Sequence, residues 1–159
     1  KNRNITGQII IKGDNVTTGY INNPKANDES YIDGWFLTGD EGLFDEDGYL
    51  KITGRLKEII NRGGEKISPK EIDEILLEHK SIQQAVAFSV PHEKLGEDLY
   101  AAVIIKEKED INENQIKEYC KQRLTQFKIP RKILIVDEIP KGATGKLQRI
   151  GLHEKLGIK

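Results

Sequence analysis

The sequence predicts an α+β fold, in which a β-hairpin-rich segment precedes a small domain with a three-stranded sheet and packed helices. Up to residue 54, short apolar runs alternate with tight-turn residues, which is typical of short strands. From residue 58 onward, strand-like runs and helix signals follow one another in the order β-α-β-β-α-β-loop-α. Although only 36% of the residues are hydrophobic, they gather into blocks that can form a core.

The first 54 residues favour strands joined by turns. Gln8–Lys12 is an apolar run bounded by glycines and predicts a strand. A polar, turn-rich stretch follows, with one short helix predicted over residues 25–31. Trp35–Thr38 predicts a strand that ends at Gly39. Asp45–Gly48 ends in Asp-Gly between two apolar runs, which is a strong hairpin signal.

The second part begins with a strand predicted over Glu58–Asn61. Ser68, Pro69 and Glu71 match a capping box with proline at the first helical position, so a helix is predicted there. The apolar positions of this helix are Ile72, Ile75, Leu76 and His79.

The remaining elements complete the small domain. Ala85–Val90, Tyr100–Ile105 and Lys132–Val136 predict strands, because each is a short apolar run. Asn112 opens a second amphipathic helix. The apolar positions of that helix are Ile116, Tyr119, Cys120, Leu124 and Phe127. A glycine-bearing loop follows, and Leu147–Leu156 predicts a terminal helix.

Composition and charge exclude several classes of function. The 25 Lys and Arg residues balance 26 Asp and Glu residues, so the net charge of −1 gives no argument for binding nucleic acid. No apolar run approaches the roughly 18 residues that a transmembrane segment needs. Three His and one Cys form no zinc-type cluster, so no metal ligands are predicted. Cys120 cannot form an internal disulfide and is interpreted as a core residue, which favours a reducing compartment.

Three loops carry residues that suit a nucleotide or a narrow ligand, and each has a plainer interpretation. Lys146 follows a glycine-bearing loop whose spacing does not fit a P-loop, so a solvated lysine remains an alternative. Gly63 and Gly64 would let a narrow ligand approach the backbone, or would simply form a β-turn. Asp40 after Gly39 could accept hydrogen bonds from a sugar diol, or form an Asx-turn.

Taken in order, these loops and their surroundings resemble successive motifs of the adenylate-forming enzymes. That superfamily holds acyl-CoA synthetases, nonribosomal peptide adenylation domains and firefly luciferase. The matching stretches are Gly7–Gly13, Gly19–Asn22, Gly34–Asp40, Gly54–Ile60, Gly63–Ile72 and Ile139–Leu147. The resemblance extends over essentially the whole chain, and Asn61–Pro69 is similar to the oxalate–CoA ligase-like group of acyl-CoA ligases.

The resemblance implies a division of the chain into three parts. Residues 1–54 would be the terminal β segment of a large N-terminal adenylation domain, residues 55–57 a hinge, and residues 58–159 a mobile C-terminal domain. The sequence contains no methionine, so we expect it to be part of a longer protein whose large N-terminal domain is its partner. We expect the chain alone to be inactive, because the resemblance places the phosphate loop and most of the acyl pocket in that domain.

The resemblance implies two half-reactions. A carboxylate attacks the α-phosphate of Mg²⁺-bound ATP to give acyl-AMP and pyrophosphate, and the thiol of CoA then displaces AMP. By motif position, Lys146 is the catalytic cation of the first step, where negative charge accumulates. Asp40 would accept hydrogen bonds from the ribose hydroxyls, and Arg55 would contact the ribose and phosphate side of the nucleotide.

Further roles follow from the same motifs. Lys66 matches a basic position near phosphate, and Lys57 matches the hinge that changes the orientation of the C-terminal domain between the two steps. Gly63 and Gly64 would line the tunnel for the pantetheine arm of CoA. Asn61 departs from several relatives and is assigned no role.

Two acceptor thiols remain open, that of CoA and that of a carrier protein loaded by an adenylation domain. The stretch Asn61–Pro69, and the end of the chain at Lys159 without a carrier domain, favour CoA. The expected partners are therefore ATP, a small carboxylic acid and CoA, with no nucleic acid. The sequence shows no signal peptide or transmembrane segment, and we expect a cytoplasmic enzyme.

Overall fold

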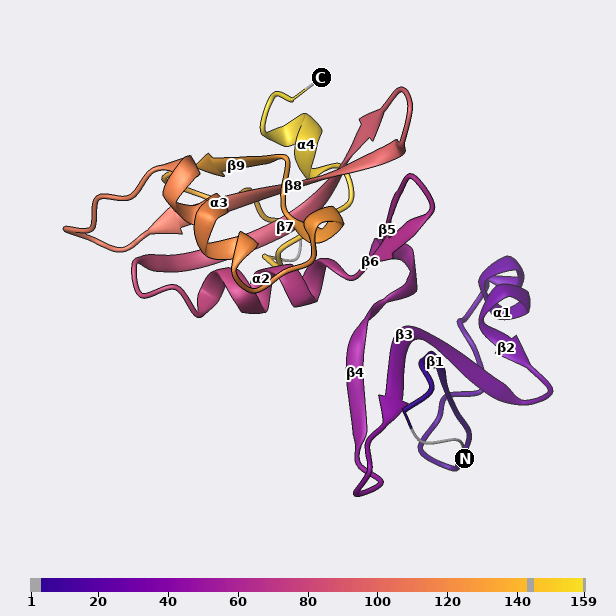
Figure 1. The fold of residues 1–159 in the computed structure, drawn as a ribbon. Helices are drawn as coiled ribbons and strands as arrows, with labels where there is room; N and C mark the ends of the chain where they lie inside the picture. Colours follow the sequence, from indigo (N-terminus) through magenta and orange to yellow (C-terminus); the bar gives the residue numbers. More distant parts are fainter. Residues whose placement is uncertain (1–3, 143–144, 159) are drawn as a thin grey trace. The chain divides into compact units, whose positions relative to one another are not determined.

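The chain forms two compact units, Lys1–Lys57 and Glu58–Lys159, in a computed structural model that describes residues 4–142 and 145–158 (Figure 1). Each unit has its own sheet. The division falls between Lys57 and Glu58, at the end of the stretch for which a hinge is predicted.

The first unit is a four-stranded antiparallel sheet built around one long strand. Its elements are β1 (Gly7–Ile11), α1 (Pro24–Ser30), β2 (Tyr31–Ile32), β3 (Trp35–Phe44) and β4 (Leu50–Arg55). Strand β3 pairs with each of the other three strands. Among the described residues of this unit only Gly42 and Gly54 are buried, so the sheet has almost no core of its own.

Most sequence predictions for the first unit are confirmed, with one correction at Gly39. The predicted helix corresponds to α1, and Gly48 lies in the turn between β3 and β4, where its N–H donates to the Asp45 carbonyl. Strand β3 does not end at Gly39 as predicted but continues to Phe44. Gly39 has a φ of +75°, a conformation that glycine adopts without strain, so it bends the strand rather than ending it.

The second unit contains a five-stranded sheet, not the predicted three-stranded one. After a 3₁₀ turn, η1 (Leu56–Glu58), its strands are β5 (Ile60–Arg62), β6 (Glu65–Ile67), β7 (Ile82–His92), β8 (Gly96–Ile105) and β9 (Lys132–Ile135). Strand β8 is central: β7 lies antiparallel on one edge and β9 parallel on the other. The hairpin of β5 and β6 joins the sheet through the pair Arg62 and Gly96.

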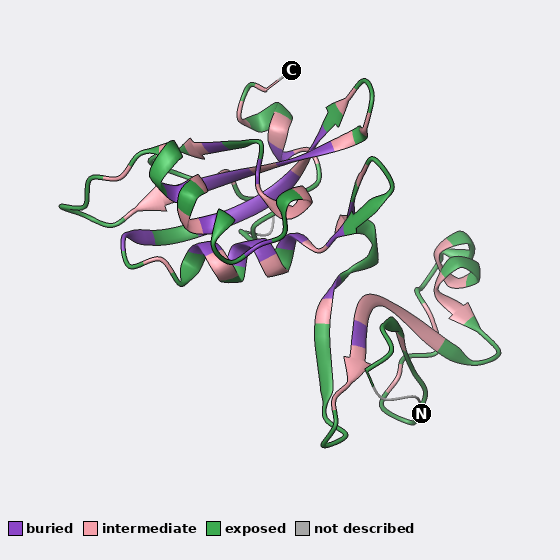
Figure 2. Ribbon diagram, viewed as in Figure 1, coloured by how far each residue is buried: buried purple, intermediate pink, exposed green. Residues whose placement is uncertain are grey.

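Helices cover both faces of this sheet. On one face, α2 (Pro69–Leu77) and α3 (Glu113–Lys121) bury Ile72, Leu76 and Ile116 in the larger hydrophobic cluster. On the other face, α4 (Leu152–Lys155) and the buried Ile139 pack against the alternate residues of β7 and β8, including Phe88. Figure 2 shows the buried residues concentrated along β7, β8 and α2. The predicted α+β class is confirmed for this unit.

Four details of the helices differ from the sequence prediction. Helix α3 ends at Lys121, so Leu124 and Phe127, predicted as apolar positions of that helix, follow it. Ser68 is the N-cap residue of α2, but its side chain makes no capping hydrogen bond, and the Glu71 carboxylate instead binds Lys128 Nζ at 2.7 Å. Helix α2 ends at Leu77, so His79 follows it and packs edge-on against Tyr119. The terminal helix is four residues long rather than ten, because Leu147 pairs with Lys141 in an isolated β-bridge.

Candidate functional site

In the first unit, the structure brings Asp40 and Arg55 together. They are directly paired residues of β3 and β4, and Arg55 Nε lies 3.0 Å from Asp40 Oδ1. The preceding turn fixes Asp40, because its N–H donates to Thr38 Oγ1 at 3.0 Å while that hydroxyl donates to the Ile9 carbonyl. The Thr38–Asp40 stretch thus forms a side-chain-stabilised bend inside a strand.

A depression of about 260 Å³ lies beside this pair. Arg55 and Lys57 line it together with Gly39, Thr38 and Tyr20. Since the ion pair uses Arg55 Nε and Asp40 Oδ1, the terminal nitrogens of Arg55 and Asp40 Oδ2 are the atoms that can reach a ligand. The site therefore offers a carboxylate oxygen for hydroxyl groups and a guanidinium for phosphate oxygens.

In the second unit, Gly63 and Gly64 form the two-residue turn of the β5–β6 hairpin. Their φ angles are +62° and +98°, and a hairpin turn with positive φ at both central residues is the type that glycine favours. The Gly63 N–H donates to the Leu95 carbonyl at 2.9 Å. The Gly64 N–H donates to Asn61 Oδ1 at 3.1 Å, so Asn61, to which no role was assigned, stabilises this turn.

The surface beside the turn is open. A depression of about 410 Å³ is lined by Arg62, Gly63, Leu95, Gln126 and Phe127. A side chain at Gly64 would meet no atom within 4 Å, whereas one at Gly63 would meet Leu95 Cδ2 at 3.0 Å. The backbone conformation therefore accounts for glycine at 64, and the open space beside it is available to a ligand.

The hairpin is anchored by an ion pair that the sequence patterns did not indicate. Arg62 Nε lies 2.8 Å from Asp98 Oδ1, and Arg62 Nη1 donates to the carbonyls of Phe127 and Ile129. Asp98 is 1% exposed and also binds Arg131 at 3.1 Å. The partners lie 36 residues apart, and Asp98 stands next to Glu97 ahead of the apolar run Tyr100–Ile105, so no local pattern indicates the pair.

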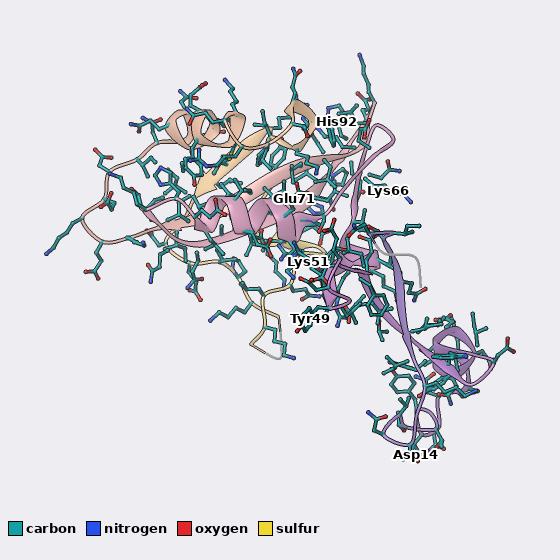
Figure 3. The ribbon with its side chains drawn as sticks, turned by 60° about the horizontal axis from the view of Figure 1, so that its bottom comes forward. Asp14, Tyr49, Lys51, Lys66, Glu71 and His92 are labelled. Carbon is teal, nitrogen blue, oxygen red and sulfur yellow. The ribbon has the colours of Figure 1, made fainter. Side chains whose placement is uncertain are left out.

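Two further polar side chains of this region are the exposed Lys66 and the half-buried His92. Lys66 is exposed on β6, paired across the hairpin with Asn61 (Figure 3). His92 lies at the end of β7, and its Nε2 is 2.8 Å from Arg131 Nη1 (Figure 3). Lys66 therefore adds one exposed positive charge to the hairpin, beside the exposed Glu65.

Lys146 lies on a separate loop near the end of the chain. The Gly142 N–H donates to the Lys146 carbonyl at 2.8 Å, and the Gly145 N–H donates to the Gly142 carbonyl at 2.9 Å. Together with the bridge between Lys141 and Leu147, these bonds close the neck of the loop and leave Lys146 exposed. Ala143 and Thr144, the centre of the predicted motif, lie outside the described residues.

Two other features bear on the chemistry. Burial raises the pKa of the Cys120 thiol to about 11, so this thiol stays protonated at neutral pH and is a core residue. Within residues 4–142 and 145–158, no group of three or more His, Cys, Asp or Glu side chains could hold a metal ion. Over the same residues, no helix has the length and apolar character needed to cross a membrane.

Comparison with known proteins identifies the family. Residues 71–146 match the AMP-binding enzyme C-terminal domain. Over 91% of its length the chain is 54% identical to a probable CoA ligase of Humulus lupulus, and over 92% it is 53% identical to an oxalate–CoA ligase of Arabidopsis thaliana. These matches span 27% and 28% of the relatives' own lengths.

Solved structures agree with the sequence relatives. ATP-bound MatB of Rhodopseudomonas palustris superposes with a TM-score of 0.89 at 34% identity, over 98% of this chain and 31% of that one. The o-succinylbenzoate CoA synthetase of Bacillus subtilis, in complex with its acyl-adenylate intermediate, gives a TM-score of 0.87 at 34% identity, over 96% and 31%. The chain therefore belongs to the adenylate-forming enzymes, and its residues 71–146 form their AMP-binding enzyme C-terminal domain.

Proposed function

We propose that the chain is the C-terminal part of an ATP-dependent acyl-CoA ligase that activates a carboxylic acid as acyl-AMP and transfers it to CoA. The observation that carries this proposal is the exposed Lys146 on a loop with a closed neck, at the last residue of the matched family domain. A compact ammonium on a long stem suits the negative charge that develops between carboxylate and α-phosphate. Lys146 is thus the catalytic cation of the adenylation step.

Asp40 and Arg55 bind the nucleotide in this proposal. Arg55 lines the depression and offers guanidinium nitrogens for the phosphate side. Asp40, its ion-pair partner, offers a carboxylate oxygen for the ribose hydroxyls. Mg²⁺ would arrive with the ATP phosphates, since the described residues supply no cluster of metal ligands. The ion would offset phosphate charge, while the protein's own groups orient the nucleotide.

The Gly63-Gly64 turn takes part in the second half-reaction, and Lys66 lies near the phosphate groups. The open surface beside Gly64 would receive the pantetheine arm, and Lys66 adds positive charge to the same hairpin. Several of the relatives are named as CoA ligases, which favours CoA over a carrier-protein thiol. Two relatives at 50% and 53% identity are named oxalate–CoA ligases, so oxalate is the first acid to test.

The test uses the full-length protein that contains this chain and measures the two half-reactions separately. Lys146→Ala should slow acyl-AMP formation by about 10²–10³-fold, because one positive charge at the developing anion is lost. ATP–pyrophosphate exchange measures this rate. Thioester formation from synthetic acyl-AMP should keep its rate. The 159-residue chain alone should form no acyl-AMP.

Lys141→Ala is the matched control. Lys141 is a lysine of the same loop, and its backbone bridge to Leu147 does not depend on the side chain. This variant should retain adenylation. If Lys141→Ala abolished adenylation while Lys146→Ala did not, or if Lys146→Ala slowed only the thioester step, the assignment of Lys146 would be wrong.

A further inference from the structure

Arg149 lies three residues beyond Lys146 and binds three different parts of the second unit. Its Nε is 3.0 Å from Glu58 Oε2, and its Nη2 is 2.5 Å from Asp73 Oδ2. Its Nη1 donates to the Ala87 carbonyl at 3.0 Å. One guanidinium thus joins the segment that follows the Lys146 loop to the η1 turn, to helix α2 and to strand β7.

Asp73 is a buried carboxylate on the inner side of α2, which is an unusual place for a charge. Besides Arg149, it accepts a hydrogen bond of 2.6 Å from the Ala87 N–H. Burial raises the pKa of Asp73 above its ordinary value, and the hydrogen bond from Arg149 acts in the opposite direction. Burial likewise opposes the charge on Arg149, but the attraction of Asp73 and Glu58 outweighs it and raises the pKa of Arg149.

Through Glu58, the ion-pair cluster of Arg149 connects the loop that carries Lys146 to the start of the second unit. Glu58 is the first residue of the second unit and directly follows Lys57, the predicted hinge. Apolar anchors hold the loop on both sides, because Ile139 before it and Leu152 after it are both buried. Arg149 is the polar anchor between Lys146 and Leu152, so it fixes the direction in which the loop leaves the domain.

We propose that Arg149 is a positioning residue for Lys146, which locks the catalytic loop to Glu58 and Asp73 so that the loop and the residue after the hinge move as one body. This inference rests on the proposed function of Lys146. Arginine is required here because its planar group donates in three directions at once, to Glu58, Asp73 and the Ala87 carbonyl. Lysine would keep the charge beside Asp73 but could not maintain all three contacts in the same geometry.

The test is a double-mutant cycle in the full-length enzyme, with the acid that the wild type activates fastest in a pyrophosphate-exchange panel beginning with oxalate. Arg149→Lys should lower kcat of adenylation by about 10- to 100-fold, as misplacement of a catalytic group does. The KM for ATP and thioester formation from synthetic acyl-AMP should stay within about twofold, because neither depends on Lys146. In the Lys146→Ala background, Arg149→Lys should cause no further loss of adenylation, because it acts through Lys146.

Two more variants separate positioning from general stability. Glu58→Gln removes the negative charge that binds Arg149 Nε, while Asp73 still holds Arg149. It should therefore lower the adenylation rate less than Arg149→Lys does. In the Lys146→Ala background it should lower that rate no further. Glu71→Gln removes another long-range pair, between Glu71 and Lys128, and should leave both half-reactions unchanged. Circular dichroism and thermal midpoints confirm that each variant is folded, and if Arg149→Lys does not fold, Glu58→Gln carries the test.

The outcomes distinguish the inference from the proposed function. If Lys146→Ala alone leaves adenylation intact, the proposed role of Lys146 is wrong. If Lys146→Ala has its effect but Arg149→Lys and Glu58→Gln have none, the positioning role is wrong. It is equally wrong if Arg149→Lys costs the same factor with and without Lys146, because the loss then does not pass through that lysine.

Discussion

Gly64 shows why a glycine can be required for two separate reasons. Its φ of +98° strains any other residue, although a side chain there would meet no atom within 4 Å. In the full-length enzyme, Gly64→Leu should cost about 1–3 kcal/mol of hairpin stability through strain alone. It should also slow thioester formation from synthetic acyl-AMP, because the leucine would occupy the open surface proposed for the pantetheine arm. Stopped-flow assays of that half-reaction measure the effect.

Gly48→Leu is the matched control for this prediction. Gly48 also has a positive φ, +88°, and open space around it, but it lies in the β3–β4 turn outside the candidate site. Both variants should carry similar strain, and only Gly64→Leu should slow the thiol step. If Gly64→Leu formed the thioester at the wild-type rate, the assignment of Gly63 and Gly64 to the path of the thiol would be wrong.

At the level of single residues, the sequence predicted the candidates that lie in local motifs and missed those that depend on distant partners. Asp40, Gly63 and Lys146 each stand beside characteristic neighbours along the chain, so their motifs are visible in one dimension. Arg62 with Asp98, and Arg149 with Glu58, are 36 and 91 residues apart. Only the folded sheet brings such partners together, so no local pattern could indicate them.

Helix α3 illustrates the element scale, because its first turn is fixed to the neighbouring strand by one carboxylate. Glu113 binds Lys117 at 2.8 Å and accepts a hydrogen bond from the Ile133 N–H of β9 at 3.0 Å. The hydrogen bond with Lys117, chiefly, lowers the pKa of Glu113 below its ordinary value of 4.5. The unfolded chain therefore takes up the proton more readily than the folded chain.

This difference predicts a pH-dependent contribution to stability. The contribution of Glu113 is present above pH 4.5 and is lost as the pH falls through the lower pKa of the folded chain. Glu113→Gln should lower the free energy of unfolding at neutral pH by at most about 1 kcal/mol, because the carboxylate is partly exposed. The difference from wild type should shrink toward zero in acid, as measured by urea unfolding across pH.

Glu118→Gln tests whether the effect belongs to the contact with β9. Glu118 lies on the same helix and pairs only locally, with Lys121 one turn on, among the contacts that the described residues show. Its substitution should change stability little at any pH. Equal destabilisation by both substitutions would assign the effect to helix charge in general.

The elements themselves were predictable where local chemistry decides them. The start of α3 is one such case, since Asn112 and Gln115 form a reciprocal capping box. The capping box predicted at Ser68 is absent: the Ser68 side chain makes no capping hydrogen bond, and the Glu71 carboxylate binds Lys128 Nζ of a distant turn. Strand β7 extends beyond its apolar run at both ends, since pairing with β8 stabilises polar residues as well.

At the scale of the whole molecule, the two units differ in how much they bury. The second unit holds all the buried apolar side chains of the described residues, while Ile10, Leu50 and Ile52 of the first are exposed. Hydrogen exchange followed by mass spectrometry should therefore show slow amides in β7 and β8 and fast ones in β1 to β4 of the isolated chain. Equal protection in both sheets would contradict this difference in core.

Lys57 tests the predicted hinge in the full-length enzyme. It is exposed within the η1 turn, directly before the second unit. Lys57→Pro fixes φ and removes an N–H, so it should restrict the change of orientation between the two steps. Adenylation should survive better than thioester formation when the half-reactions are assayed separately. An equal loss of both rates would count against Lys57 as the hinge.

The buried Cys120 makes the chain convenient for site-directed labelling. It is the only cysteine of the 159 residues, it is fully buried, and burial raises the pKa of its thiol to about 11. Maleimide reagents and thiol-reactive nitroxides react with the thiolate, so they should not label Cys120 in the folded protein. A single cysteine introduced at an exposed position such as Asp110 would then carry a fluorophore or spin label without any prior removal of the native residue.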